Sequence, residues 1–69
     1  MAKTIQKIGT HTIEADYSAW TGMAKIRLDG QELLSKFTFG HTEIITVDDK
    51  KYAVKFYGII FPNVEIQEI

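Results

Sequence analysis

The two histidines, His11 and His41, are the side chains of this sequence best suited to acid–base catalysis or metal binding, because imidazole changes charge near neutral pH. Each stands close to a glycine at the expected start of a strand. A zinc site would need a further protein ligand, for which Glu14 and Glu43 are conceivable donors, but the sequence has no H-x-H or H-E-x-x-H spacing. We expect two surface histidines and no metal site, with a site of some kind as the alternative.

Other residue types that carry out catalysis occur without the neighbours they need. Nucleophilic catalysis requires a hydroxyl or thiol activated by a base, but Ser18 and Ser35 lie in no recognised motif and the chain has no cysteine. Asp48 and Asp49 could form an acid–base pair, although the two lysines that follow are typical of a solvated turn. The glycines match neither a dinucleotide-binding nor a phosphate-binding loop. We therefore predict a protein that is not an enzyme and uses no cofactor.

The aromatic residues are a stronger indication of function than the polar ones. One tryptophan, three tyrosines and four phenylalanines exceed what a small core needs, and we expect Phe39, Tyr57 and Phe61 to be at least partly exposed. Stacking aromatics beside basic residues would favour single-stranded nucleic-acid binding on a small barrel. The segment 36–40 lacks the flanking glycine and basic surroundings of such a motif, and the net charge is −1. Nucleic acid is therefore the less favoured alternative.

Residues 57–61 form the most hydrophobic and least alternating part of the chain. They could be a strand that crosses between two sheets and is buried on both faces. Alternatively they form an interface, because three successive apolar residues cannot all face one core layer. The last strand is a candidate sheet edge for a partner strand, although its glutamates could instead discourage pairing. The predicted binding residues are Trp20, Tyr57, Ile59, Ile60 and Phe61.

Length and composition limit the protein to one small domain, which we place at residues 1–69. A core of this size gives little stability and no cysteine is present to form a disulfide, so a partner subunit would help. No apolar segment reaches the roughly 18 residues of a membrane span. We expect a cytoplasmic protein that binds another protein or itself as a homodimer and has no membrane partner.

Alternating polar and apolar residues predict short strands that would position these side chains. We expect strands at residues 3–8, 11–17, 23–28, 31–39, 42–47, 52–57 and 64–69, separated by turn-forming residues. Asp29 and Gly30 predict a two-residue type I′ turn, because this pair accepts positive φ at both positions. The expected fold is an all-β antiparallel meander that forms a β-sandwich, with a small closed barrel as the alternative.

The same alternation selects the residues expected to face inward. Trp20 is expected to cap one end of the core. The predicted core consists of Ile13, Ala15, Ala24, Ile26, Leu28, Leu33, Phe37, Ile45, Val47, Tyr52, Val54, Phe56, Val64 and Ile66.

Residues 17–30, YSAWTGMAKIRLDG, precede Phe37-x-Phe39-Gly40 and a turn of sequence VDDKKY. With an earlier His-x-Ile-Glu strand, this pattern resembles the small β-sandwich domains of the Fas apoptotic inhibitory molecule family and similar short bacterial proteins. The chain is shorter than that family's domain and ends without its last strand hairpin. The resemblance implies a non-catalytic sandwich that works by binding proteins, and it identifies no binding or catalytic residue in this chain.

Overall fold

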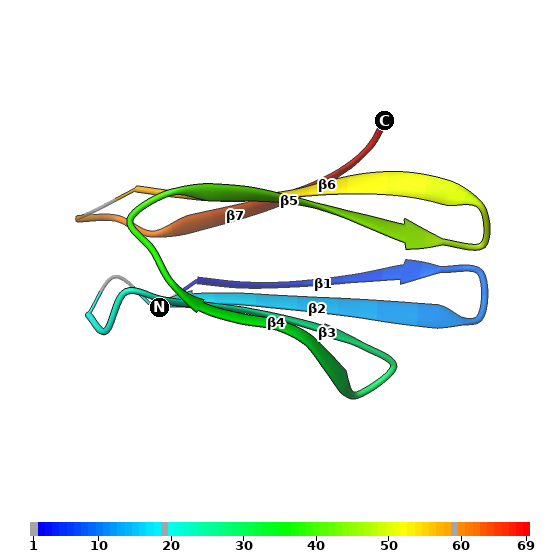
Figure 1. Ribbon diagram of the computed structural model, residues 1–69, viewed down its shortest axis with the longest axis horizontal. Helices are drawn as coiled ribbons and strands as arrows, with labels where there is room; N and C mark the ends of the chain where they lie inside the picture. The colour runs from blue at the N-terminus through cyan, green and yellow to red at the C-terminus, as the bar shows by residue number, and fades with distance from the viewer. Residues whose placement is uncertain (1, 19, 59) are drawn as a thin grey trace.

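The computed structural model describes residues 2–18, 20–58 and 60–69, and these residues form seven antiparallel strands and no helix (Figure 1). Within this part of the chain no helix could cross a membrane. The all-β prediction is confirmed. The strands are β1 (Ala2–Ile8), β2 (His11–Ser18), β3 (Met23–Leu28), β4 (Gln31–Phe37), β5 (His41–Val47), β6 (Lys50–Tyr57) and β7 (Asn63–Glu68).

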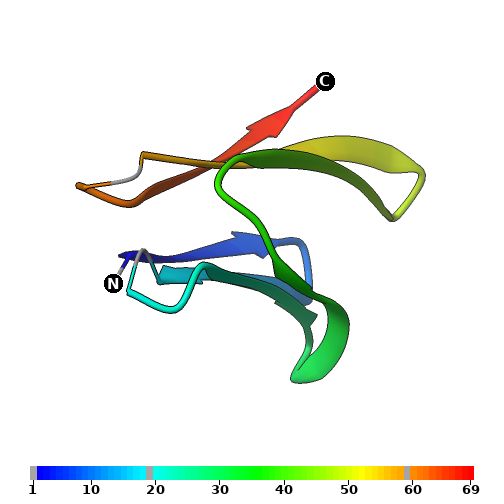
Figure 2. The same ribbon diagram turned by 60° about the vertical axis from the view of Figure 1, so that its left-hand side comes forward.

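The strands form two open sheets that stack face to face. One sheet has the order β1-β2-β3-β4 and the other β5-β6-β7, so every paired strand is also a neighbour in sequence. Figures 1 and 2 show the two layers, with the connection from β4 to β5 as the crossing between them. The predicted sandwich is confirmed, and the barrel alternative is wrong because the sheets do not close on each other.

In two of the three two-residue hairpin turns, both central residues adopt the left-handed conformation. Asp29 and Gly30 have φ angles of 52° and 83°, and Leu28 faces Gln31 across the turn, as a type I′ turn requires. Asp48 and Asp49 have φ angles of 51° and 65° and form a second turn of this kind. The second turn is tighter than the sequence suggested, so β6 begins at Lys50.

Most of the predicted core is buried between the sheets. The two exceptions are Leu33 and Phe37, and Leu28 and Ile66 are only partly buried. Tyr17 and Ala53 are buried as well. The buried predicted residues are Ile13, Ala15, Ala24, Ile26, Ile45, Val47, Tyr52, Val54, Phe56 and Val64.

A bulge in β4 explains why Leu33 and Phe37 lie outside the core. Ile26 faces Leu34 and Arg27 faces Glu32, so Leu33 is the extra residue between them. Because successive strand side chains point to opposite faces, one extra residue reverses the facing of the residues that follow it. Leu34 therefore packs against the core, while Leu33 is 47% exposed and Phe37 is exposed beside Met23.

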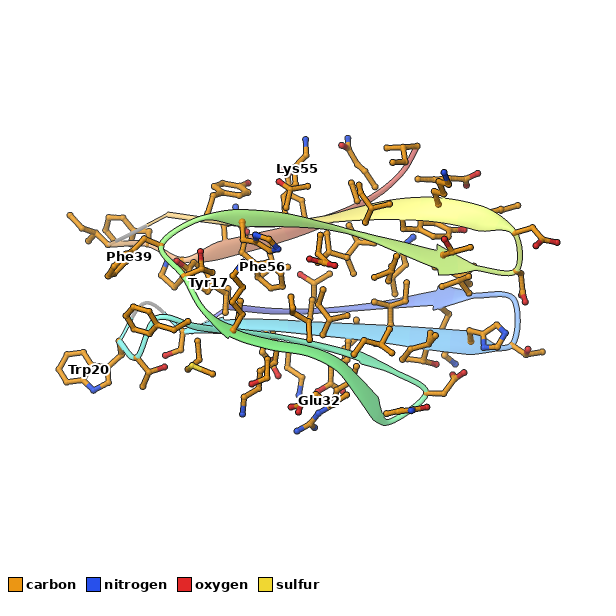
Figure 3. All side chains as sticks on the ribbon, viewed as in Figure 1. Tyr17, Trp20, Glu32, Phe39, Lys55 and Phe56 are labelled. Carbon is orange, nitrogen blue, oxygen red and sulfur yellow. The ribbon has the colours of Figure 1, made fainter. Side chains whose placement is uncertain are left out.

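The prediction that Trp20 caps the core is wrong. Its side chain is 96% exposed and projects away from both sheets in Figure 3. Tyr17 and Phe56 fill the interior nearby, with ring centroids 5.8 Å apart in an edge-to-face arrangement. The Tyr17 hydroxyl donates a hydrogen bond to the Thr38 carbonyl oxygen at 3.0 Å, which joins the core to the crossing between the sheets.

Candidate functional site

The antiparallel topology gives the sandwich two chemically different ends. The β1–β2, β3–β4 and β5–β6 connections are two-residue turns at one end, which we call the turn end. The β2–β3, β4–β5 and β6–β7 connections lie together at the other end, on the left of Figure 1. Since alternate connections of a meander meet at the same end, residues far apart in sequence are brought together at each.

Large apolar side chains gather where the three longer connections meet. Trp20 lies in the first connection and Phe39 in the second, and Figure 3 shows both at this end. Ile60 and Phe61 in the third connection are 81% and 85% exposed. We call this surface the aromatic end and define it as Trp20, Phe37, Phe39, Tyr57, Ile60 and Phe61, all of which are exposed.

The aromatic end includes four of the five predicted binding residues, and Ile59 lies outside the described residues. The expectation that Phe39, Tyr57 and Phe61 are at least partly exposed is confirmed. The interpretation of residues 57–61 as a strand buried on both faces is wrong for Ile60 and Phe61, because the chain turns at Gly58 instead of crossing the core. The sequence did not predict that Phe37 belongs to this surface.

Local contacts hold the connections in place. The amide of Thr38 donates to the carbonyl oxygen of Gly22 at 2.8 Å, which ties the first connection to the second. A side chain at Gly22 would overlap the ring of Phe37, and Phe37 packs edge-to-face on Phe39 with centroids 5.3 Å apart. The aromatic end is therefore a surface with defined geometry, held by backbone and ring contacts.

The third connection is fixed at its base by polar contacts. Gly58 has a φ of 90°, and any Cβ there would overlap the carbonyl oxygen of Phe61, so the turn requires glycine. The Tyr57 hydroxyl donates to the Glu65 carboxylate at 3.0 Å and accepts from the Asn63 side-chain amide at 2.9 Å. The hydrogen bond to Glu65 raises the pKa of Tyr57 above its usual value, so the hydroxyl remains a donor.

At the turn end, His11 lies between two carboxylates. Its Nδ1 lies 2.6 Å from the Asp29 carboxylate in the β3–β4 turn, and its Nε2 lies 3.2 Å from the Asp48 carboxylate in the β5–β6 turn. The hydrogen bond to Asp29 is the largest cause that raises the pKa of His11, whereas partial desolvation opposes it. The same hydrogen bond lowers the pKa of Asp29, and the amide of Thr12 donating to its other oxygen lowers it further.

This arrangement favours the protonated form of the His11 ring. Both ring nitrogens face carboxylates, so only the protonated ring can donate to both, and neither nitrogen is free to accept a proton from a substrate. The prediction of a surface histidine holds in part, because the side chain is 32% exposed but ion-paired. In a sequential meander all three tight turns fall at one end, and this rule could have indicated that Asp29 and Asp48 meet His11.

The remaining candidates for chemistry are placed apart from His11. His41 begins β5 at the other end of the sandwich, where its Nε2 lies 2.8 Å from the Glu43 carboxylate. The conceivable ligand Glu14 instead pairs with Lys3 at 3.3 Å. Among the residues that the structure describes, no three histidine, cysteine or acidic side chains are placed to hold a metal ion.

The outer face of the four-stranded sheet carries alternating charges next to a depression. Arg27 on β3 and Lys3 on β1 both approach Glu14 on the strand between them, at 3.9 Å and 3.3 Å. Lys3 and Lys25 likewise lie opposite Asp16 in neighbouring strands. The negative charges on the outer face of β2 thus offset the positive charges on β1 and β3. The depression, about 430 Å³ in volume, is lined by Lys3, Asp16, Ser18, Thr21, Met23 and Lys25.

Comparison of the chain with protein-family models, with curated proteins and with solved structures found no match. The resemblance to the Fas apoptotic inhibitory molecule family therefore stays a prediction.

Proposed function

We propose that this chain is a non-enzymatic interaction module that binds another protein through its aromatic end. The single observation that carries the proposal is the placement of exposed aromatic side chains from three separate connections at one end of the sandwich. Scattered exposed apolar residues are normal on a protein surface, but several exposed aromatic residues at one end of a small fold are typical of an interaction site.

The residue types at the aromatic end suit protein recognition. Aromatic side chains bury a large area with few rotatable bonds, and tryptophan and tyrosine are enriched among the residues that dominate binding energy. Trp20 is almost fully exposed in the free chain, so nearly all of its surface is available for burial by a partner. The hydrogen bond from the Thr38 amide to the Gly22 carbonyl oxygen joins two of the connections in the free chain, and such order before binding lowers the entropy lost on association.

Binding to single-stranded nucleic acid is the second candidate and receives less support. Stacking of bases on Trp20 or Phe39 would need a basic groove along the backbone path. Lys3 and Lys25, two basic residues of the four-stranded sheet, lie opposite Asp16, which reduces their attraction for phosphate. Tryptophan fluorescence titrated with an oligothymidylate at low salt distinguishes the two functions, since only nucleic-acid binding gives quenching that weakens with added salt.

We also propose a cytoplasmic location. Its support is the absence of cysteine, because small secreted domains commonly depend on disulfides for stability.

Site-specific photocrosslinking tests the proposed protein partner. A benzophenone amino acid replaces Phe61 in one variant and Ile5, an exposed residue on the outer face of β1, in a matched control. We expect one discrete adduct from position 61 in lysate of the cells that produce the chain. Excess unlabelled wild-type chain should compete for it, whereas excess Phe61→Ser should not. No adduct at position 61, or the same adducts at both positions, would contradict the proposal.

A further inference from the structure

The free edge of β5 differs from the other sheet edges. β4 carries the bulge at Leu33, which disrupts a regular edge. β1 and β7 lie side by side, and the Thr4 hydroxyl donates to the Val64 carbonyl oxygen at 3.2 Å, so these two edges partly cover each other. β5 instead pairs with β6 without a register shift from His41 to Val47 and contains no lysine, proline or glycine. It therefore lacks the bulge, lysine and proline by which many natural edges avoid pairing, and its one charged residue on the inner face, Glu43, is held by His41 at 2.8 Å.

The hydrogen-bonding groups of this edge can be assigned from the turn that precedes β6. In a two-residue hairpin the residues that flank the turn, here Val47 and Lys50, bond to each other, and the pattern then alternates along the strand. The amide and carbonyl groups of Thr42, Ile44 and Thr46 consequently point away from β6. No hydrogen bond from another described residue reaches these groups. No ribbon crosses the outer side of β5 in Figure 1.

We propose that β5 pairs with β5 of a second copy of this chain, antiparallel about a two-fold axis through Ile44. This proposal concerns a surface separate from the aromatic end and does not depend on the proposed function. The edge sequence is self-complementary in this register: Thr42 lies opposite Thr46 of the second copy, and Ile44 lies opposite its own counterpart. The side chain of Ile44 is 48% exposed in the single chain and would be covered by this contact.

Charge and strand length select this register over its two neighbours. In the proposed register Glu43 lies opposite Ile45 of the second copy, and the acidic Asp48 turn of one chain lies beside the His41 end of the other. A shift that moves the axis to Glu43 would place two glutamates directly opposite, which is unfavourable. A shift the other way, with the axis at Ile45, would leave Thr42 beyond the paired strands. The register through Ile44 is the one that uses the whole strand.

The proposed pairing has a consequence for the shape of the assembly. The two three-stranded sheets would join into one continuous sheet, as in β-augmentation. Because the paired strands are antiparallel, the aromatic ends of the two copies would face opposite directions. The dimer would present two identical binding ends. A single strand pair buries less area than most stable interfaces, so we expect reversible association that depends on protein concentration.

Charge-swapped variants at Ile44 test the proposal by sedimentation equilibrium of the full chain. The wild type should dimerise as its concentration rises from micromolar to millimolar. In Ile44→Lys two lysines would lie directly opposite, so the dimer dissociation constant should rise by about tenfold or more. Ile44→Glu should behave in the same way. An equimolar mixture of the two variants should recover the dimer, because opposite charges then face each other.

Two further variants distinguish this interface from other forms of self-association. Ile5→Lys makes the same change at an exposed isoleucine of an edge strand in the other sheet and should leave the dimer unchanged. Phe61→Ser alters the aromatic end and should also leave it unchanged. Circular dichroism confirms that each variant is folded. A wild type that stays monomeric to millimolar concentration overturns the proposal, as does a folded Ile44→Lys variant that dimerises normally or a dimer lost in Phe61→Ser.

Discussion

The Nδ1 atom of His11 lies 2.6 Å from the carboxylate of Asp29, and this contact connects the β1–β2 hairpin to the β3–β4 hairpin. Asp29 is held in turn by Thr12, whose amide donates to the carboxylate and whose carbonyl accepts from the Asp29 amide. Asp48 brings the other sheet to the same imidazole. At the turn end, ion pairs thus connect the three turns, whereas at the aromatic end a backbone hydrogen bond and ring packing connect the first two connections.

This arrangement predicts a pH-dependent stability. The pKa of His11 is raised above 6.5 in the folded chain, so its contribution is complete below pH 6.5 and is lost as the pH rises through the folded value. The pKa of Asp29 is lowered below 3.8, so its contribution is complete above pH 3.8 and is lost as the pH falls through the folded value. We expect the pair to stabilise the fold most between these two limits.

Urea unfolding at pH 5.5 and pH 8.5 measures the alkaline half of this effect. The wild type should have the lower midpoint at pH 8.5, and His11→Gln should lose most of the difference. His41→Gln is the matched control, because it removes the other histidine at the opposite end of the sandwich. A pH dependence that survives in His11→Gln and disappears in His41→Gln would show that it does not arise from the ion pairs of His11.

The second aspartate turn predicts a stabilising substitution. Asp49 has a φ of 65° at the second central position of its turn, where glycine adopts the left-handed conformation without strain. We expect Asp49→Gly to raise the free energy of unfolding by about 0.5 kcal/mol. Thr10→Gly is the control, since Thr10 is also in a tight turn but does not have a positive φ, and glycine there should destabilise. Thermal unfolding of both variants checks the opposite signs.

The sequence predicted the inward-facing residues correctly where the strands are regular. In β2 and β3 the alternation is unbroken, and Ile13, Ala15 and Ile26 are buried as expected. In β4 the alternation gave the wrong face, because a bulge on an edge strand leaves no mark in the order of polar and apolar residues. Both Leu33 and Leu34 are apolar, so composition could not choose between them.

The candidate site was predicted in part for a similar reason. The excess of aromatic residues and the run at 57–61 indicated exposure, and the structure places Ile60 and Phe61 on the surface. The prediction for Trp20 failed because a large aromatic residue is usually buried, whereas here the preceding strand already fills that end of the core with Tyr17. The meander rule could have placed His11 and Asp48 at the same end, but the contact itself depends on how the two sheets stack, which no local pattern encodes.

The bulge predicts unequal effects for two adjacent leucines. Leu34→Ala removes a side chain that packs against the core, whereas Leu33→Ala removes one that is half exposed. We expect Leu34→Ala to lower the free energy of unfolding by about 1–2 kcal/mol and Leu33→Ala by about 0.5 kcal/mol or less. Chemical denaturation measures both. If Leu33→Ala proved the more damaging change, β4 would pair without the bulge and the original core prediction would be right.

Exposure of the aromatic end predicts that its residues can be changed without loss of stability. Trp20→Ser and Phe61→Ser should each shift the free energy of unfolding by no more than about 0.5 kcal/mol, because neither side chain is buried in the fold. Phe56→Ala provides the contrast, with an expected loss of about 3–5 kcal/mol from a fully buried ring. In the wild type, Trp20 fluorescence should be quenched by acrylamide almost as strongly as free tryptophan. A protected tryptophan, or a large loss of stability in Trp20→Ser, would place this residue back in the core and remove the central element of the proposed binding surface.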